Sequence, residues 1–505
     1  MGFVQGTDRE QTMLLTYEDM VADNAMVRVI DRFIEVVDLD KLCFQKIIPA
    51  ATGRPPYSRK ALTKLYVYGY ENGVRSSRKL EKETGRNVEV MWLLEGITPD
   101  HITISEFRKE NIRPLQKLFR EFVKLCKSWE LVGGEVEAID GSKFKASNNK
   151  KNNFSRKKID DRLARLDEKI NSYFSEMDTA DKADEADQTA NIIELQKLLD
   201  RKELYEEYKR RLDESGENEL STVDPDARLM GNNRGGVDVA YNVQSTVDGK
   251  HDIIIDYSVS VNPSDQHQLG IMVKRAKRIL KVRRFTVLAD KGYYNGEDLL
   301  RVKKYKATAI VSKQKPSDAK SLPDKFKSEN FIYDEPTDTY ECPASQTLSS
   351  PTKKKSKRRN YFNKTACINC PHKTECISGN AKRRTITRSQ YSKIYEETDK
   401  LFKENKALYK RRQQIVEHPF GTVKHTMNGR YFLVRTRRKV RTEVALLFLG
   451  YNLKRVVSIL GFEGIMARLN NLLLSNFYYL ENVITMKISM SIFDNIIGTV
   501  CLSIA

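Results

Sequence analysis

The stretches VEAIDG (136–141) and FTVLADKG (285–292) decide the fold class of this chain. Each is a short apolar run that leads into an aspartate closely followed by glycine, the pattern of a strand that brings a carboxylate to the edge of a sheet. Aspartate near glycine is also an ordinary turn signal, so neither stretch alone establishes a site. Taken together, they predict that Asp140 and Asp290 lie at the ends of two strands.

Three further stretches complete the predicted sheet. They read DVAYNVQSTVDG (238–249), HDIIIDYSVSV (251–261) and KATAIVSK (306–313), and each is bounded by turn residues. Helical patterns at Gln266–Leu280 and Gly296–Tyr305 separate the later strands. Three strands followed by helix, strand, helix and strand, with another helix later in the chain, predict an α/β fold with a mixed sheet.

The N-terminal part of the chain is predicted to be helical. Ser58 is placed to cap a helix over Ser58–Glu71, and a short helix is expected to begin at Ser76 or Ser77. Two apolar helix faces are formed by Val27, Ile30, Ile34 and Val37, and by Leu115, Phe119, Phe122 and Cys126. Such a domain suits DNA binding or dimerisation, and a plain helical scaffold with solvated charges would explain the same pattern.

A chain of 505 residues is long enough for two or three domains. A predicted helical hairpin with a coiled-coil-like seam (Ile159, Leu163, Leu166 and Ile170, then Tyr205, Tyr208 and Leu212) interrupts the sheet. The expected parts are a helical DNA-binding or dimerisation domain (1–130), the first part of the sheet core (131–147 and 223–315), the helical-hairpin insertion (148–222), a basic insertion with cysteines (316–395), C-terminal core helices (396–470) and a tail (471–505).

The charge balance narrows the class of partner. The chain has 88 Lys and Arg against 68 Asp and Glu, which leaves a net charge of +20. Such an excess favours a polyanion such as nucleic acid, although an anionic membrane surface would select for the same charge. No secretory signal is recognised, and Lys454 and Arg455 interrupt the longest apolar stretch, so no membrane span is expected. The prediction is a soluble, cytoplasmic, nucleoid-associated protein without a disulfide framework.

A third carboxylate, Glu417, lies in the stretch QQIVEHPFGTVK (413–424). On a helix, Lys424 would lie two turns from Glu417 on the same face, whereas Pro419 indicates that a helix starts or kinks here. Asp140, Asp290 and Glu417 can converge on one point. Hard cations such as Mg²⁺ prefer oxygen ligands, and two of them about 3.5–4 Å apart can assist phosphoryl transfer. In a strongly basic chain, this predicts metal-holding carboxylates surrounded by Lys and Arg that hold DNA.

Several motifs in order along the chain carry a family resemblance. They are GRPPY (53–57), GVRSSRKLE (73–81), IDGSK (139–143), DPDAR (224–228), AYNVQ (240–244), ADKGY (289–293), VE (416–417) and FGTVK (420–424). Through them, over roughly residues 10–470, the chain resembles the DDE transposases of bacterial insertion sequences, which have a ribonuclease H-like catalytic core. The resemblance implies an α/β fold with that core, the N-terminal helical domain and the two insertions.

The resemblance also implies a chemistry. Asp140, Asp290 and Glu417 would be the catalytic triad that binds Mg²⁺ or Mn²⁺, and Lys424 would lie near the DNA backbone as the Lys of the Glu-x6-Lys signature. The remaining candidate DNA contacts are Lys143, Lys291 and Arg228, and Arg228 has the alternative role of bracing the triad.

Two features depart from the family. In one large branch, a Tyr and an Arg precede the Glu by seven and four residues, whereas Tyr409 and Arg412 precede Glu417 by eight and five. On a helix this shift rotates both side chains by about 100°, so that branch's roles are not assigned to them. The apolar tail from about Lys487 to Ala505 has no counterpart in the family.

Four of the seven cysteines form a candidate metal site. Cys342, Cys367, Cys370 and Cys376 have the spacing C-x24-C-x2-C-x5-C. Four thiolates suit a structural, tetrahedral Zn²⁺, and free thiols in a basic loop are the alternative. Two other residues receive structural roles: Tyr241 is expected in the core, and His418 is expected next to Glu417.

The resulting function hypothesis is a DNA transposase that cleaves element ends and joins 3′-hydroxyl ends to target DNA by two-metal phosphoryl transfer. Its expected partners are double-stranded DNA, as terminal inverted repeats and as target, and a second copy of the chain on that DNA. Two alternatives remain: a catalytically inactive DNA-binding protein of the same fold, and a metal-dependent nuclease without strand transfer. Joined products would distinguish a transposase from both.

Overall fold

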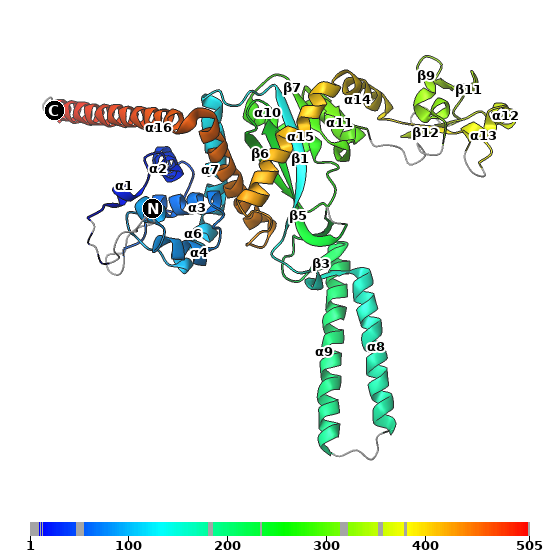
Figure 1. Ribbon diagram of the computed structural model, residues 1–505, viewed down its shortest axis with the longest axis horizontal. Coiled ribbons are helices and arrows are strands. Elements are labelled where there is room, and N and C mark those ends of the chain that lie inside the picture. The colour runs from blue at the N-terminus through cyan, green and yellow to red at the C-terminus, as the bar shows by residue number, and fades with distance from the viewer. Residues whose placement is uncertain are drawn as a thin grey trace, which may run out of the picture.

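The computed structural model describes residues 10, 12, 14–46, 55–179, 185–232, 235–313, 322–351, 357–377 and 381–502, without the side chains of 176–179, 185–191 and 476–502. Figure 1 shows four parts around a central sheet: a helical head near the N-terminus, a long helical hairpin that projects away, a small lobe beyond α14, and a C-terminal helix that extends from the head side.

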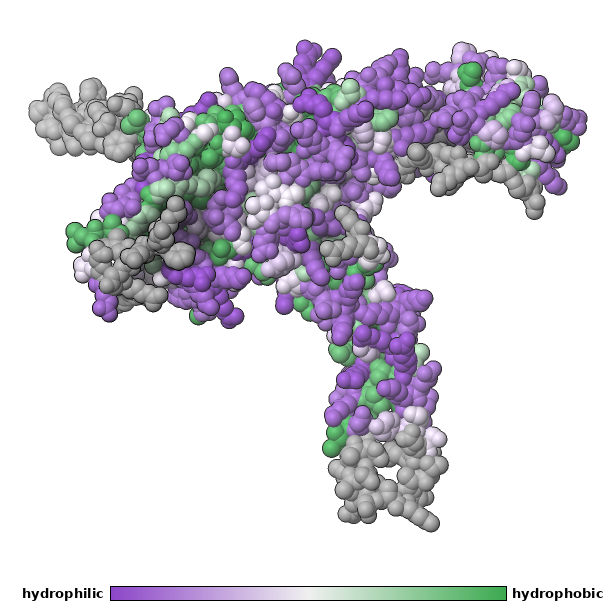
Figure 2. Space-filling view, viewed as in Figure 1, coloured by the Kyte–Doolittle hydropathy of each residue, from purple (hydrophilic) through white to green (hydrophobic). Residues whose placement is uncertain are grey.

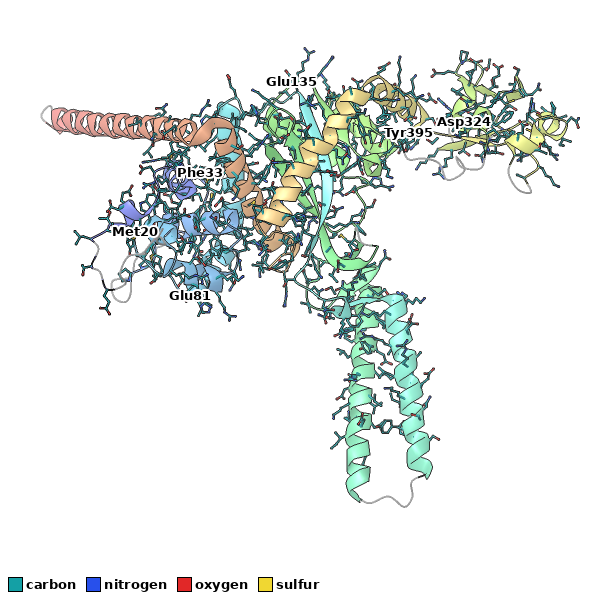
Figure 3. The ribbon with its side chains drawn as sticks, viewed as in Figure 1. Met20, Phe33, Glu81, Glu135, Asp324 and Tyr395 are labelled. Carbon is teal, nitrogen blue, oxygen red and sulfur yellow. The ribbon has the colours of Figure 1, made fainter. Side chains whose placement is uncertain are left out.

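The head is formed by short helices around an apolar centre. Ser58 caps α3 as predicted, because its side chain accepts a hydrogen bond from the backbone N–H of Lys60. Phe33 (labelled in Figure 3) packs edge-on against Phe122, with ring centroids 5.1 Å apart. Both predicted apolar faces are buried. The helices are α1 (Tyr17–Met20), α2 (Met26–Val36), α3 (Arg59–Glu71), α4 (Ser77–Thr84), α5 (Val88–Leu93), α6 (His101–Glu110) and α7 (Ile112–Ser128).

The central sheet has the order β6-β5-β1-β7-β8, and the short strand β4 also pairs with β5. β5 runs antiparallel to both β6 and β1, whereas β7 runs parallel to β1 and β8 runs parallel to β7. This is the ribonuclease H-like topology, as the resemblance implies. The strands are β1 (Val136–Lys145), β4 (Arg228–Gly231), β5 (Val237–Asp248), β6 (Ile254–Ser260), β7 (Phe285–Ala289) and β8 (Ala307–Val311).

The first strand does not end where the sequence predicted. β1 continues through Asp140 and Gly141 to Lys145, because its antiparallel partner β5 extends the pairing as far as Lys145 opposite Ala240. The turn signal Asp-Gly is overridden by this long-range pairing. Asp140 therefore lies in the middle of a strand, at the point where the parallel neighbour β7 ends.

A buried carboxyl group in β1 predicts pH-dependent stability. Glu137 is fully buried, and burial and the neighbouring carboxylate of Asp248 raise its pKa well above the ordinary value of 4.5. As pH rises above 4.5, the unfolded chain loses this proton while the folded chain keeps it, so the free energy of unfolding falls. We expect Glu137→Gln to remove this pH-dependent decrease in the free energy of unfolding. The difference in melting temperature, variant minus wild type, should therefore rise between pH 5 and pH 8. A constant difference would contradict the prediction.

Helices position the remaining elements of the core. α10 (Leu269–Leu280) packs against β6 and β5, α11 (Gly296–Lys304) packs against β8, and α15 (Lys406–Gly421) lies across β1, β5 and β7. α14 (Ser392–Glu404) leads from the small lobe back to the sheet, and its Tyr395, labelled in Figure 3, stacks on Tyr294 at 4.8 Å.

The expectation that a helix starts at Pro419 is wrong. α15 runs through this residue to Gly421, and a π-helical turn, Thr422–Thr426, follows directly. Because proline has no N–H, α15 lacks one hydrogen bond at this position, that to the carbonyl of Ile415.

The helical hairpin consists of α8 (Arg156–Thr179) and α9 (Glu185–Ser215), and its seam is formed as predicted. Ile159 and Leu212 are buried together near the sheet, and Leu166, Ile170 and Leu198 are buried further out. At the base, β2 (Asn153–Ser155) pairs with β3 (Glu219–Ser221). Figure 2 shows a mostly hydrophilic hairpin surface with smaller apolar areas along it. The acidic stretch Asp178–Gln188 lies between the two halves of the seam, and its residues 180–184 are outside the described residues.

The small lobe contains two separate short sheets and a core of five buried residues: Phe331, Tyr340, Leu348, Tyr361 and Ile386. Asp324, labelled in Figure 3, lies near its start. Most of the predicted basic run Lys353–Arg359 lies outside the described residues. The elements of the lobe are β9 (Ile332–Asp334), β10 (Thr339–Glu341), β11 (Thr347–Leu348), β12 (Arg358–Tyr361), α12 (Lys364–Ile368), α13 (Lys373–Cys376) and β13 (Ile386–Ser389).

The last helix, α16 (Arg437–Leu502), joins the head to the sheet and is broken at Gly461, whose φ is 72°. It packs against α2, α3, α7 and β6. Its segment Arg437–Ser475 is long and apolar enough to cross a membrane, by length and composition alone. However, 61% of its most apolar window is buried inside the fold, as in the core helix of a globular protein. The predicted tail after Lys487 continues this helix to Leu502.

Candidate active site

The parallel pairing of β1 and β7 brings the two predicted aspartates together. Ile139 lies opposite Ala289, so the next residues, Asp140 and Asp290, are neighbours at the end of this ladder. The Asp290 carboxylate accepts a hydrogen bond from the backbone N–H of Gly292 at 2.7 Å, which fixes the turn after β7. Two residues that are 150 positions apart in sequence therefore share one edge of the sheet.

Asp140 and Glu417 line a common cavity of about 820 Å³. Glu417 reaches it from α15 and is solvent-exposed, whereas Asp140 is mostly shielded by β1 and its neighbours. The other ionisable side chains that line this cavity are Lys143, Lys145, Asp238, Asp265, Lys424, His425 and Arg430. The cavity thus combines a carboxylate centre with a cationic rim.

The sequence analysis missed Asp265, a further carboxylate in this cavity. It lies in the loop between β6 and α10, and its Oδ1 accepts hydrogen bonds from the Asn242 amide at 2.8 Å and the Gln244 amide at 2.7 Å. Gly141 leaves the room it needs, because a Cβ there would approach Asp265 Oδ1 to 2.3 Å. The loop sequence NPSDQ gives no local signal for this role, since it depends on two amides from β5.

The pKa of the Asp140 carboxyl group is raised in this environment. Burial raises the pKa of Asp140 to about 7, with Asp290 and Asp265 adding to the shift and the Arg412 guanidinium opposing it. A buried carboxyl group flanked by like charges has the donor chemistry of a site for a hard divalent cation, which would relieve the repulsion. Within the described ranges, no three or more His, Cys, Asp or Glu side chains lie close enough together to hold a metal ion as they stand. The carboxylates of this site are therefore in an open arrangement.

Lys424 lies beside this centre, as the helical spacing predicted. Its ammonium group donates to Ser142 Oγ at 2.7 Å and to the carbonyl of Lys143 at 2.9 Å, and it lies over the Phe144 ring. Burial lowers its pKa to about 8, with the Asp140 carboxylate opposing that shift. Lys424 is thus held over β1 on the rim of the cavity.

Arg412 also belongs to the site, although the sequence analysis assigned it no role. One guanidinium nitrogen lies 4.0 Å from Asp140 Oδ2. Five residues along an α-helix correspond to a rotation of about 140°, so Arg412 and Glu417 leave α15 in different directions. The length of the arginine side chain still allows it to reach β1. Tyr409 points elsewhere and donates to Ser312 Oγ at 3.0 Å.

Other predicted residues have structural contacts. Arg228 donates to the carbonyls of Pro225 and Ala227 and pairs with Glu217, and none of these contacts is with the three catalytic candidates. Tyr241 is a core residue as expected. Lys291 is exposed in the turn after Asp290 and is not among the residues that line the cavity.

His418 does not support Glu417. Its Nδ1 lies 3.0 Å from the hydroxyl of Tyr451 in α16, on the side of α15 that faces this helix.

The four candidate zinc ligands meet in the small lobe. Cys342, Cys367, Cys370 and Cys376 all line one cavity of about 30 Å³, and all are free thiols. Burial raises the pKa of the Cys376 thiol, and the other three thiols raise it further. The thiols therefore line the same cavity, although no three or more His, Cys, Asp or Glu side chains in the described part of the chain form a group that could hold a metal ion.

Comparisons with known proteins give two family matches. A family model described as "Transposase domain (DUF772)" matches residues 15–110, and one described as "Transposase DDE domain" matches residues 341–457. Among solved structures, the chain is similar to a piggyBac transposase in a synaptic complex with hairpin DNA, with 10% identity, a TM-score of 0.31, and coverage of 90% of this chain and 80% of that one. No curated protein matches. The head and the segment around Glu417 are thus each similar to a transposase domain.

Proposed function

We propose that this DNA transposase cleaves the ends of its element and joins the freed 3′-hydroxyl groups to target DNA, with Asp140, Asp290 and Glu417 as the catalytic carboxylates. The observation that carries the proposal is that Asp140 is next to Asp290 at the end of the β1–β7 ladder and shares with Glu417 a cavity with a cationic rim. A nuclease of this type needs both features, because the reacting phosphate and the flanking phosphates are negatively charged.

Asp140, Asp290 and Glu417 would hold Mg²⁺ or Mn²⁺. When bound, two such ions would activate the attacking oxygen and stabilise the leaving oxygen of an in-line displacement. The open arrangement of the carboxylates suits this role, since Mg²⁺ keeps several water ligands and uses few protein ligands.

The side chains of the rim would hold the substrate. Lys424 is fixed by two hydrogen bonds over β1, so its charge lies at a defined place next to Asp140. Lys143, Lys145 and Arg430 line the same cavity and are exposed, which suits contacts with the phosphates on either side of the cleaved bond. Arg412 balances the negative charge of Asp140 from the α15 side. Joining two ends requires at least two active sites, so we propose a homodimer on double-stranded DNA.

A cleavage and joining assay tests the proposal. The substrate is a labelled duplex that carries the DNA flanking this reading frame, incubated with the full chain and a target plasmid, with and without Mg²⁺. We expect nicked and joined products with the metal and neither without it. Nicks without joined products would favour the nuclease alternative. DNA binding without cleavage in both Mg²⁺ and Mn²⁺ would favour the inactive DNA-binding alternative.

We also propose that the four cysteines of the small lobe bind a structural Zn²⁺. Its hydrophobic core contains only five buried residues, and a core of that size is rarely sufficient without a metal or disulfides. The backbone N–H of Gln346 points at Cys342 Sγ at 3.4 Å, which would support a thiolate at this position. Four thiolates leave no open position on the ion, so the zinc would stabilise the lobe and take no part in catalysis.

Metal analysis tests the zinc proposal. We expect one zinc ion per purified chain, and an absorption band of thiolate-bound cobalt after exchange with Co²⁺. Cys370→Ser should lose both, because tetrahedral zinc sites with thiolate ligands rarely tolerate the loss of a ligand. Cys43→Ser is the matched control, since Cys43 is an exposed thiol in the head. Equal zinc content in the two variants would exclude the site.

A further inference from the structure

A second basic cavity, of about 370 Å³, lies between the head and the segment that precedes α16. Arg108 and Lys109 reach it from the end of α6, and Arg435 and Lys439 reach it from the other side. Ser147, which follows β1, also lines it. Among the residues that the structure describes, no acidic side chain lines this cavity, in contrast to the active-site cavity, so its chemistry matches an anion with several oxygens.

Three of the four cations are available to a ligand. Lys109, Arg435 and Lys439 are exposed, and their side chains make no hydrogen bond or ion pair with any residue that the structure describes. Arg108 is different, because it lies over the Tyr66 ring and interacts with the tyrosines of α3. The cavity therefore combines a fixed cation with three cations that have no internal partner among the described residues.

Backbone hydrogen bonds at the end of β1 join the segments that line the two basic cavities. The backbone N–H of Lys145 donates to the carbonyl of Arg430 at 3.1 Å, and the N–H of Phe432 donates to the carbonyl of Lys145 at 2.8 Å. Lys145 and Arg430 line the active-site cavity, whereas Ser147 and Arg435 line the second one.

This connection sets a length scale. Arg430 and Arg435 are five positions apart, so their Cα atoms are at most about 18 Å apart even when the segment is extended. One strand of B-DNA presents about five phosphates over that axial length. One continuous stretch of DNA backbone of that length can therefore reach the cations of both cavities.

We propose that this second cavity binds backbone phosphates of the same DNA duplex whose reacting phosphate occupies the active-site cavity. The inference rests on the proposed function, and it assigns Lys109, Arg435 and Lys439 to DNA binding. Since the cavity is lined from both the head and the core, the duplex would contact both parts next to the cleavage site. Its position relative to the catalytic carboxylates would then be set by contacts that carry no sequence information.

The test is the salt dependence of DNA binding by the full chain. Arg435→Gln/Lys439→Gln removes two charges four residues apart at the second cavity. Lys274→Gln/Arg278→Gln removes the same two charges at the same spacing from α10, where both side chains are exposed and neither lines the cavity. All measurements use the Asp140→Asn background, so that binding is recorded without cleavage and a failure of the proposed chemistry does not affect the result.

The cavity variant is expected to bind a flanking-end duplex about 10- to 100-fold more weakly at low salt, and to reduce the slope of log Kd against log salt by about two. The α10 variant should retain the wild-type slope. Equal losses in both variants would indicate a general effect of net charge, and no loss in the cavity variant would exclude the contact; either result overturns the proposal.

Shortened duplexes and a free anion locate the contact. The duplex is shortened from each end in steps of about five base pairs. For the chain with an intact second cavity, one of these steps should weaken binding, because it removes the contacted phosphates. The same step should cause no loss in the cavity variant. If inorganic phosphate, compared with chloride at equal ionic strength, removes the difference between the variants, the cavity is a site for free phosphate and the proposal fails.

Discussion

Asp140→Asn is expected to lower strand cleavage by at least about 10³-fold, the upper range for the loss of a single electrostatic contribution in an enzyme site. Asparagine has nearly the same shape, and its side-chain oxygen can still accept the hydrogen bond from Gly141 that Asp140 accepts at 2.9 Å. The variant therefore loses the charge and keeps the fold. The measurement is the single-turnover rate of nicking in Mg²⁺, together with the affinity for the uncleaved duplex, which should remain unchanged or increase.

Asp238→Asn is the matched control for this variant. Asp238 lines the same cavity, but it lies on β5 and faces Lys145 at 3.5 Å and the amide of Asn232. Its loss should change cleavage by less than about 10-fold, since a partly exposed ion pair contributes little. Cleavage by Asp140→Asn at the wild-type rate would show that the carboxylate centre has been assigned to the wrong residues.

Glu443→Gln is expected to destabilise the chain by about 3–5 kcal/mol, the usual cost of removing one partner of a buried ion pair. Glu443 and Arg75 are 0% and 2% exposed, and their nearest atoms are 3.4 Å apart. The Glu443 carboxylate also accepts hydrogen bonds from the Tyr70 hydroxyl and from the backbone N–H groups of Leu433 and Val434. It thus joins the head, α16 and the segment before it, and glutamine cannot accept from all of these donors or neutralise Arg75.

Thermal melting and limited proteolysis measure this effect. The melting temperature should fall by several degrees, and cleavage sites should appear in the head and near Leu433. Glu81→Gln is the control, because Glu81 (labelled in Figure 3) pairs with His101 while both are more than a third exposed. That pair is expected to contribute less than about 1 kcal/mol. Equal melting temperatures for the two variants would contradict the role of Glu443.

Local sequence patterns predicted most of the sheet and the head correctly. The five predicted strands and the two helices between them are present, with ends shifted by a few residues. Short apolar runs and capping residues such as Ser58 carry this information within a few positions. The hairpin seam was also recognisable, because its apolar spacing repeats over several turns.

The features that sequence analysis missed depend on distant parts of the chain. β1 continues past the Asp-Gly turn signal because β5 pairs with it. Asp265 enters the site because Asn242 and Gln244 hold its carboxylate. Arg412 reaches Asp140 because α15 lies across β1, which no spacing along the helix can indicate. Asp140 and Asp290 were predicted as site residues, whereas their direct adjacency required the register of two parallel strands.

The base of the hairpin gives this fold a modular character. Asn153–Ser155 pairs with Glu219–Ser221, and the N–H of Thr222 donates to the carbonyl of Asn152, so the chain leaves and re-enters the sheet domain at adjacent points. The hairpin beyond this β2–β3 pair begins and ends at adjacent points. Its length therefore has little effect on the strands that hold Asp140. Through evolution or engineering, the hairpin can therefore be lengthened, shortened or exchanged for another module while the catalytic sheet retains its register.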